Sequence, residues 1–371
     1  MQHWPVSSRT FAIKRTLSAF SSLALIGLLL TLPIAAHAQE STEPTSEVGD
    51  ATEETVNTDD EQPLGLVSVI DAGPPKVPED TGLTPEIAYS AFQRGWFLTA
   101  LAMATPLAEE GDTSAQTLLG VLHETGQGIK LDYAKAADWY TLAAAQGNAD
   151  AAVRLGQLYL LGNGVEQDKN KAADYFEIAA KADNPTALYN LALLYQAGEG
   201  RSYDAEKARE LLVQAARLNE PEAQYSLGLS FLEGIDGEIN EGQGAFWLGR
   251  AARRGHTSAQ VYYGILRHQG KGLDPNEAEA AAWFERAALA GNPVGMNRLA
   301  RIYANGRGKT PNQMQAAAWH YVARTLGVPD PLLDEFVDTL DSDVIKAAQA
   351  QANQYTATLL APGSDQTPPS P

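Results

Sequence analysis

Few residues of this chain could do chemistry. After the first 38 residues it has four histidines, His123, His256, His268 and His320, and cysteine is absent throughout. A metal centre needs a second ligand at a suitable spacing, as in His-Glu-x-x-His, and no such spacing occurs. Neither Gly-x-Ser-x-Gly nor Ser-x-x-Lys is present. The sequence predicts no catalytic, metal-binding or cofactor-binding residue, although an enzyme assembled from scattered residues stays an alternative.

Gly-x-Gly pairs are typical of phosphate-binding loops, but here they favour architecture. They recur at one fixed interval, and glycine supplies the left-handed conformation that ends helices. The pairs are Gly126/Gly128, Gly162/Gly164, Gly198/Gly200, Gly270/Gly272 and Gly306/Gly308. The fourth place reads Gly234-Ile235-Asp236-Gly237, which predicts a different loop.

An Asp or Asn recurs at the same interval. A ladder of carboxylates could bind metal ions, but half of these residues are amides and they lie one repeat apart. We interpret them as helix N-caps. They are Asp132, Asp168, Asp204, Asn240, Asn276 and Asn312.

The elements that position these residues are copies of one repeat. Leu119-Gly120 returns 36 residues later as Leu155-Gly156, and the interval holds as far as Leu299-Ala300. Residues 113–328 divide into six copies, each predicting a helix A that contains the Leu-Gly pair and a helix B after the Asp or Asn. Such a period indicates a solenoid whose repeats pack mainly on their neighbours. On helix B we expect Trp139, Tyr175 and their equivalents to fill the space between hairpins.

The ends of the array need caps. Residues 81–112 predict a capping hairpin that starts at Thr84-Pro85, with threonine as the cap. Residues 329–360 predict capping helices from Leu332 to Leu340 and from Val344 to Leu359. Residues 361–371, rich in proline and serine, predict a disordered tail.

Residues 1–38 have the features of a secretory signal. A basic stretch ending at Lys14-Arg15 precedes an apolar run from Leu23 to Leu32, and Ala36-His37-Ala38 fits cleavage after Ala38. We expect a periplasmic or secreted protein without a membrane span after cleavage; an uncleaved anchor is the alternative.

Acidic residues dominate the remainder. The formal charge is −19, and since the signal contributes +3 the rest carries −22. A chain this acidic repels phosphate backbones, which argues against nucleic-acid partners. Residues 39–80 hold twelve acids against one lysine, and they predict a disordered linker in which Leu64 to Ile70 is a linker stretch or a docking motif.

The repeat resembles the Sel-one-like repeat family, a tetratricopeptide-like class. The matching residues are Ala151, Leu155-Gly156, Tyr159, Gly162-x-Gly164-Val165, Asp168, Lys171-Ala172, Tyr175-Phe176 and Ala179-Ala180. The resemblance implies an all-α, right-handed superhelical solenoid of antiparallel helix pairs that holds other proteins. Some cysteine-rich relatives are associated with β-lactam binding or hydrolysis, but this chain has no cysteine.

Partner-binding residues are expected where the repeats differ. By analogy with tetratricopeptide repeats, the fifth and ninth positions of helix A face inward. The residues we select there are Tyr189, Leu193, Tyr225, Leu229, Asn297 and Arg301. The first four form a stripe suited to a peptide, unless they only pack the inner curve. The sequence thus predicts an exported, non-enzymatic scaffold that binds protein or peptide partners. The alternative is a β-lactamase-like or cell-wall hydrolase. A third hypothesis is binding of partners through the acidic linker.

Overall fold

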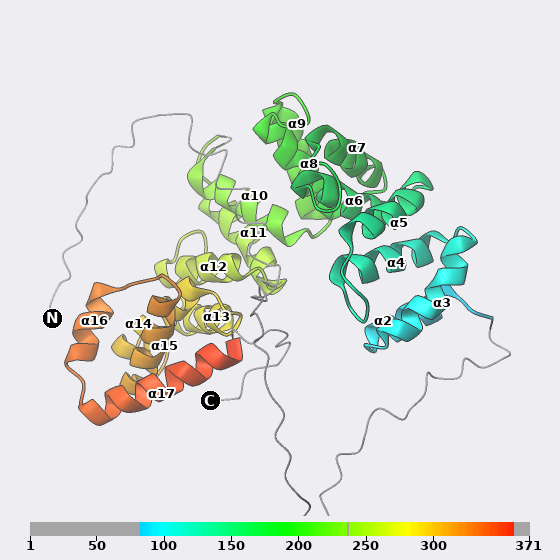
Figure 1. The fold of residues 1–371 in the computed structure, drawn as a ribbon. Helices are drawn as coiled ribbons and strands as arrows, with labels where there is room; N and C mark the ends of the chain where they lie inside the picture. Colours follow the sequence, from blue (N-terminus) through cyan, green and yellow to red (C-terminus); the bar gives the residue numbers. More distant parts are fainter. Residues whose placement is uncertain (1–81, 236, 360–371) are drawn as a thin grey trace, which may run out of the picture. The chain divides into compact units, whose positions relative to one another are not determined.

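A computed structural model describes residues 82–235 and 237–359 (Figure 1). These residues form sixteen α-helices, and no strand occurs among them. The predicted signal, acidic linker and C-terminal tail lie outside the described residues. The helices are α2 (Pro85–Gln93), α3 (Phe97–Glu109), α4 (Thr113–Thr125), α5 (Tyr133–Ala145), α6 (Ala149–Leu161), α7 (Lys169–Ala180), α8 (Pro185–Ala197), α9 (Ala205–Arg217), α10 (Pro221–Glu233), α11 (Glu241–Arg253), α12 (Thr257–Gln269), α13 (Glu277–Leu289), α14 (Pro293–Asn305), α15 (Gln313–Thr325), α16 (Pro331–Asp338) and α17 (Ser342–Leu359).

The helices pack in chain order. Each helix A (α4, α6, α8, α10, α12 and α14) contacts its own helix B, and each helix B contacts the helix A that follows. Figure 1 shows this succession of hairpins from α4 to α15. The all-α solenoid predicted from the repeat is confirmed.

Capping residues determine where the helices begin and end. All six predicted Asp and Asn residues cap a helix B by accepting a backbone N–H. Helix A ends at a left-handed glycine in every copy, including the fourth, where Gly234 has φ +66°. Asp183 and Asn219 take the left-handed conformation at the two places where helix B lacks a final glycine. Thr84 is the N-cap residue of α2, as predicted, although its side chain accepts no backbone hydrogen bond.

The Leu-Gly pair has a packing reason. A Cβ added at Gly156 would lie 2.7 Å from the ring of Phe176, and one at Gly120 would overlap Tyr140. Phe176 and Tyr140 are fully buried, whereas the preceding Tyr175 is half-buried. In these two copies the fully buried ring inside the hairpin is the residue after the one expected to fill the space between hairpins, and the sequence analysis did not select it. Glycine on helix A makes the room for it.

The second glycine of each Gly-x-Gly pair joins neighbouring repeats. At Gly200 an added Cβ would overlap the backbone of Lys169, at the start of the preceding helix B. Gly164, Gly272 and Gly308 approach backbone at the start of the preceding helix B in the same way. These glycines therefore permit close packing between repeats, besides adopting a left-handed conformation.

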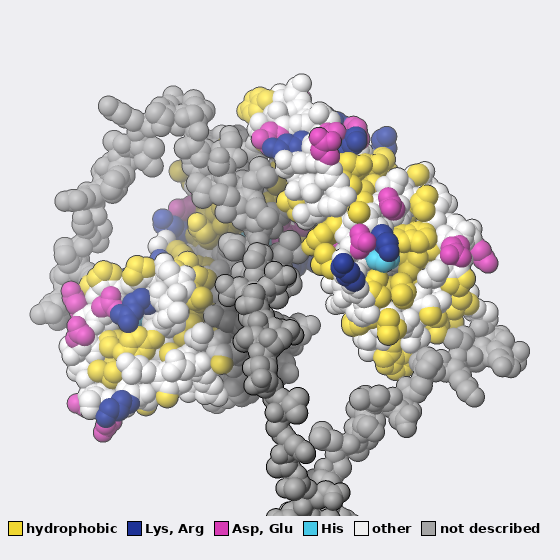
Figure 2. Space-filling model, in the orientation of Figure 1, with side chains coloured by type: hydrophobic (Ala, Val, Ile, Leu, Met, Phe, Trp, Pro, Cys, Tyr) yellow, Lys and Arg dark blue, Asp and Glu magenta, His cyan; other side chains and the backbone are white. Residues whose placement is uncertain are grey.

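The last repeat is covered by α16 and α17, as predicted, with boundaries shifted by one or two residues. Tyr355 of α17 stacks on Trp319 of α15 with ring centroids 4.2 Å apart. Among the described helices, none has the length and apolar character needed to cross a membrane. Figure 2 shows acidic, basic and hydrophobic side chains interspersed on the visible face of the described residues.

Candidate functional site

The selected tyrosines contact the next repeat. Tyr189 of α8 hydrogen-bonds Ser226 of α10, and burial raises the pKa of its phenol. Tyr225 of α10 stacks on His256 with ring centroids 4.4 Å apart and meets Tyr262 of α12 edge-on at 5.8 Å. The structure thus links successive A helices through residues that the sequence analysis did not select: Ser226, His256 and Tyr262.

One aromatic and aliphatic surface results. Leu193 and Leu229 lie one turn after the two tyrosines and are half-buried. Tyr262 is 40% exposed. We call Tyr189, Leu193, Tyr225, Leu229 and Tyr262 the tyrosine face. Four of its five residues were predicted. Tyr262 was missed because it stands at the sixth helix-A position, and the selection took only the fifth and ninth.

An acidic pair borders the tyrosine face. Thr186 of α8 donates a hydrogen bond of 2.9 Å to Glu220 Oε2, and Glu220 shares a further hydrogen bond with Glu222. Burial, together with the Glu222 carboxyl, raises the pKa of Glu220 to about 7. Glu220 and Glu222 also act electrostatically on Tyr189, which places the pair beside the tyrosine face.

Glu220 stands where neighbouring repeats have a cap. Before α6, α8 and α14 the equivalent residue is asparagine, and its side-chain oxygen accepts a backbone N–H of helix A. His256 does the same before α12 through Nδ1, 3.0 Å from Ala259 N, so its Nδ1 carries no proton. Glu220 makes no cap hydrogen bond. Its carboxyl is turned to Thr186 and Glu222 instead, a departure from the repeat that calls for an explanation.

The two other selected residues serve a different place. Asn297 Nδ2 donates to Asp330 Oδ2 over 2.8 Å, and Arg301 binds the same carboxylate through Nε at 2.6 Å and Nη2 at 2.9 Å. Burial raises the pKa of Asp330, but these donors outweigh it and hold the pKa below its usual value. Asp330 caps α16, so Asn297 and Arg301 attach the C-terminal cap and lie apart from the tyrosine face in the repeat order.

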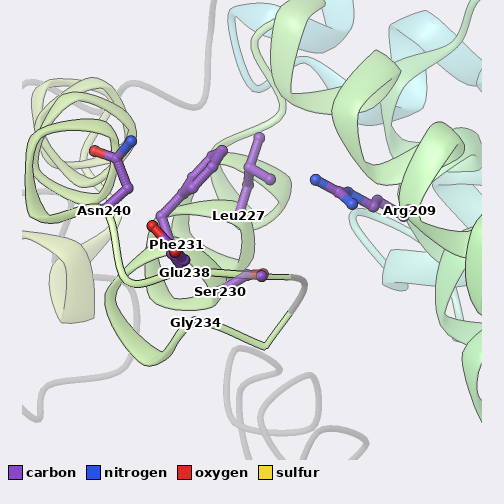
Figure 3. Close-up of a pocket in the computed structure, with 8 residues that line it drawn as sticks. Arg209, Leu227, Ser230, Phe231, Gly234, Glu238 and Asn240 are labelled. Atoms are coloured by element: carbon purple, nitrogen blue, oxygen red, sulfur yellow. The ribbon is translucent and has the colours of Figure 1, made fainter.

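The fourth loop differs from the others, as its glycines predicted. Its second glycine, Gly237, stands one residue later than in the other copies, and a pocket of about 210 Å³ lies beside it (Figure 3). Arg209 of α9 points across the pocket toward Leu227 of α10 (Figure 3). Arg209 and Ser230 both have interactions within the chain. We therefore interpret the pocket as a packing consequence of the shifted glycine.

The histidines are dispersed. His256 is a helix cap, and His320 is fully buried with Nε2 2.7 Å from Asp334 Oδ1. Within the part of the chain that the structure describes, no group of three or more His, Asp or Glu side chains could hold a metal ion.

Sel1 repeats match residues 113–148, 149–184, 185–220, 221–256, 257–292 and 293–328. The chain belongs to the Sel1 repeat family. The match confirms the resemblance drawn from the Leu-Gly interval, and this Sel1 repeat chain has the scaffold fold that commonly serves protein interaction. The comparison with curated proteins finds no match.

One solved structure has a similar fold, and a second is similar in sequence. A Sel1 repeat protein from Oxalobacter formigenes is 28% identical, with a TM-score of 0.61, over 66% of this chain and 100% of that one. A Sel1 repeat protein from Klebsiella pneumoniae is 29% identical, with a TM-score of 0.37, over 54% of this chain and 98% of that one.

Proposed function

We propose that this Sel1 repeat chain is an exported, non-enzymatic scaffold that binds a protein or peptide partner on the tyrosine face. The main support for this proposal is that three consecutive A helices place tyrosines and leucines side by side where the other repeats have other residues. Aromatic residues supply large contact area at low cost in side-chain entropy, and they dominate binding energy in many interfaces.

The acidic pair does not have the spacing of a glycosidase site. Glycosidases separate their two carboxyls by about 5–9.5 Å to admit a sugar or a water molecule. Glu220 and Glu222 are hydrogen-bonded to each other, which leaves no such gap. For the β-lactam version of the hydrolase alternative, we expect no nitrocefin turnover above background by the purified protein.

Site-specific crosslinking tests the surface. A photoreactive benzoylphenylalanine at Tyr262 should give a discrete adduct in cells. The same group at Leu142, an exposed residue of α5 on helix B, should not. Identical adducts from both positions, or adducts from Leu142 alone, would show that the tyrosine face is not the binding surface. Folding of both variants is checked by circular dichroism.

Export rests on residues 1–38 and needs its own test. The mature protein should be recovered from the periplasm or the medium with Gln39 as its first residue, as N-terminal sequencing would show. A cytoplasmic protein that keeps its N-terminus would contradict the proposed localisation and leave the binding surface untouched.

A further inference from the structure

The Glu220 carboxyl is buried without a counter-charge. The residue is 9% exposed, although burying a carboxylate costs several kcal/mol unless a cation or several donors compensate. Among the described residues, none of the ion pairs involves Glu220 or Glu222. Thr186 supplies one neutral donor. A cation that would satisfy the pair is missing from this part of the chain.

Two groups that interact with the pair, Tyr189 and His256, are aromatic and uncharged at neutral pH. The cation Arg250 donates to Asn219 Oδ1 over 2.6 Å, next to Glu220 in the chain, and forms no ion pair with Glu220 or Glu222 among the described residues. Tyr189 faces the pair from α8, and burial raises the pKa of that phenol. His256 at the start of α12 feels the Glu222 charge, but burial lowers the pKa of its imidazole, which stays neutral. The ring of Tyr225 covers His256. Phenol rings beside a carboxyl pair offer negative charge and negative π faces together.

We propose that a lysine or arginine side chain of the partner binds at the tyrosine face and pairs with Glu220 and Glu222. This inference rests on the proposed function and names the chemistry of the partner: a segment with a cation next to apolar residues that reach Leu193 and Leu229. The cation would donate a charge-assisted hydrogen bond to the carboxylates and would also contact the π faces of the tyrosines.

Proton release follows from this pairing. At pH 6 the pair holds a proton, because the pKa of Glu220 is raised to about 7. A bound cation takes the place of that proton, so binding at pH 6 releases close to one proton and the affinity rises as the pH increases to 8. Lysine and arginine keep their charge over this range, and burial lowers the pKa of His256, so we assign the proton release to the carboxyl pair.

Peptide selection on the full mature chain tests the chemistry. Dodecapeptides from a random library should be enriched in lysine and arginine beside leucine or aromatic residues. Selection on the E220Q/E222Q variant should lose the cation but keep the apolar residues. Glu206→Gln, an exposed acid in the first turn of α9 and outside the tyrosine face, is the control and should keep the enrichment.

Titration calorimetry then measures the affinity of the most enriched peptide and that of a copy with norleucine in place of the cation. Both the norleucine peptide and the E220Q/E222Q variant should weaken binding by about tenfold or more. At pH 6, titration in two buffers of different ionisation enthalpy should show proton release for wild type and none for the variant. Single Glu220→Gln and Glu222→Gln variants repeat the measurement if the double variant is less stable.

The outcomes separate the two proposals. Peptides that lose binding on Tyr262→Ala but carry no cation would overturn the cation site and leave the tyrosine face as a binding surface. Peptides that bind equally well to Tyr262→Ala, Glu220→Gln and wild type would overturn both. Enrichment of cations that survives E220Q/E222Q would place the acidic contact elsewhere and overturn this inference.

Discussion

Glu220→Asn should stabilise the protein, and more so at high pH. Asparagine is the residue that caps the equivalent helix in three other repeats, and such a cap contributes about 0.5–2 kcal/mol. The hydrogen bond from Thr186 is lost or changed, at a cost of about 1 kcal/mol. At pH 5 these two effects nearly cancel, so we expect a change of less than about 1 kcal/mol.

The pH dependence comes from the raised pKa. The usual pKa of the carboxyl is 4.5 and the folded value is about 7, so the folded state binds the proton more tightly than the unfolded one. This contribution to stability is present below pH 4.5, is lost as the pH rises through 7, and changes no further above that. The change from 4.5 to about 7 corresponds to at most about 3.4 kcal/mol, and we expect about 1–3 kcal/mol because water still reaches part of the pair.

Urea unfolding at pH 5, 6, 7 and 8, followed by helical circular dichroism, measures this. The advantage of Glu220→Asn over wild type should grow by about 1–3 kcal/mol from pH 5 to pH 8. Glu233→Gln should show no such growth, because that acid is exposed. A constant difference between Glu220→Asn and wild type at all four pH values would refute the reasoning, as would an advantage that shrinks towards pH 8.

Other positions give further predictions, measured by the same unfolding assay. Gly200→Ala should lower the free energy of unfolding by at least about 2 kcal/mol, because its Cβ overlaps the preceding repeat. Gly291→Ala, with φ +83° and open space around it, should lower it by only about 1 kcal/mol, and equal losses would contradict the inter-repeat contact. Gly156→Ala should cost about 1–3 kcal/mol through overpacking against Phe176, and a neutral result would show that the ring has room to move. Asp330→Asn should cost about 1–3 kcal/mol at pH 7, and because the folded pKa is lowered the loss should shrink as the pH falls below 4; a loss that persists at pH 3 would exclude the charge as its cause.

The repeat interval made the architecture predictable. The Asp and Asn caps and the helix-ending glycines follow local rules of backbone conformation, which the structure confirms residue by residue. Predictions that depended on side-chain direction were less accurate. The sequence analysis named Tyr175 as a ring between hairpins and did not foresee that Phe176, one residue later, lies over Gly156 inside the hairpin. A shift of one residue turns a helical side chain by about 100°, and the sequence pattern around an aromatic pair does not resolve that rotation.

At the candidate site, too, local features were predictable from the sequence and contacts between repeats were not. Periodicity identified the A helices, because local capping and helical spacing are encoded within each copy. The analogy with tetratricopeptide repeats then selected the positions at which the middle repeats differ from the others. Contacts between copies decided the rest: Tyr262 joined the tyrosine face, Asn297 and Arg301 were bound to Asp330, and Glu220 was buried beside Glu222 without a cation. Apart from the neighbours Glu220 and Glu222, these contacts join side chains that lie about 30 or more residues apart in the chain and meet only when the repeats stack.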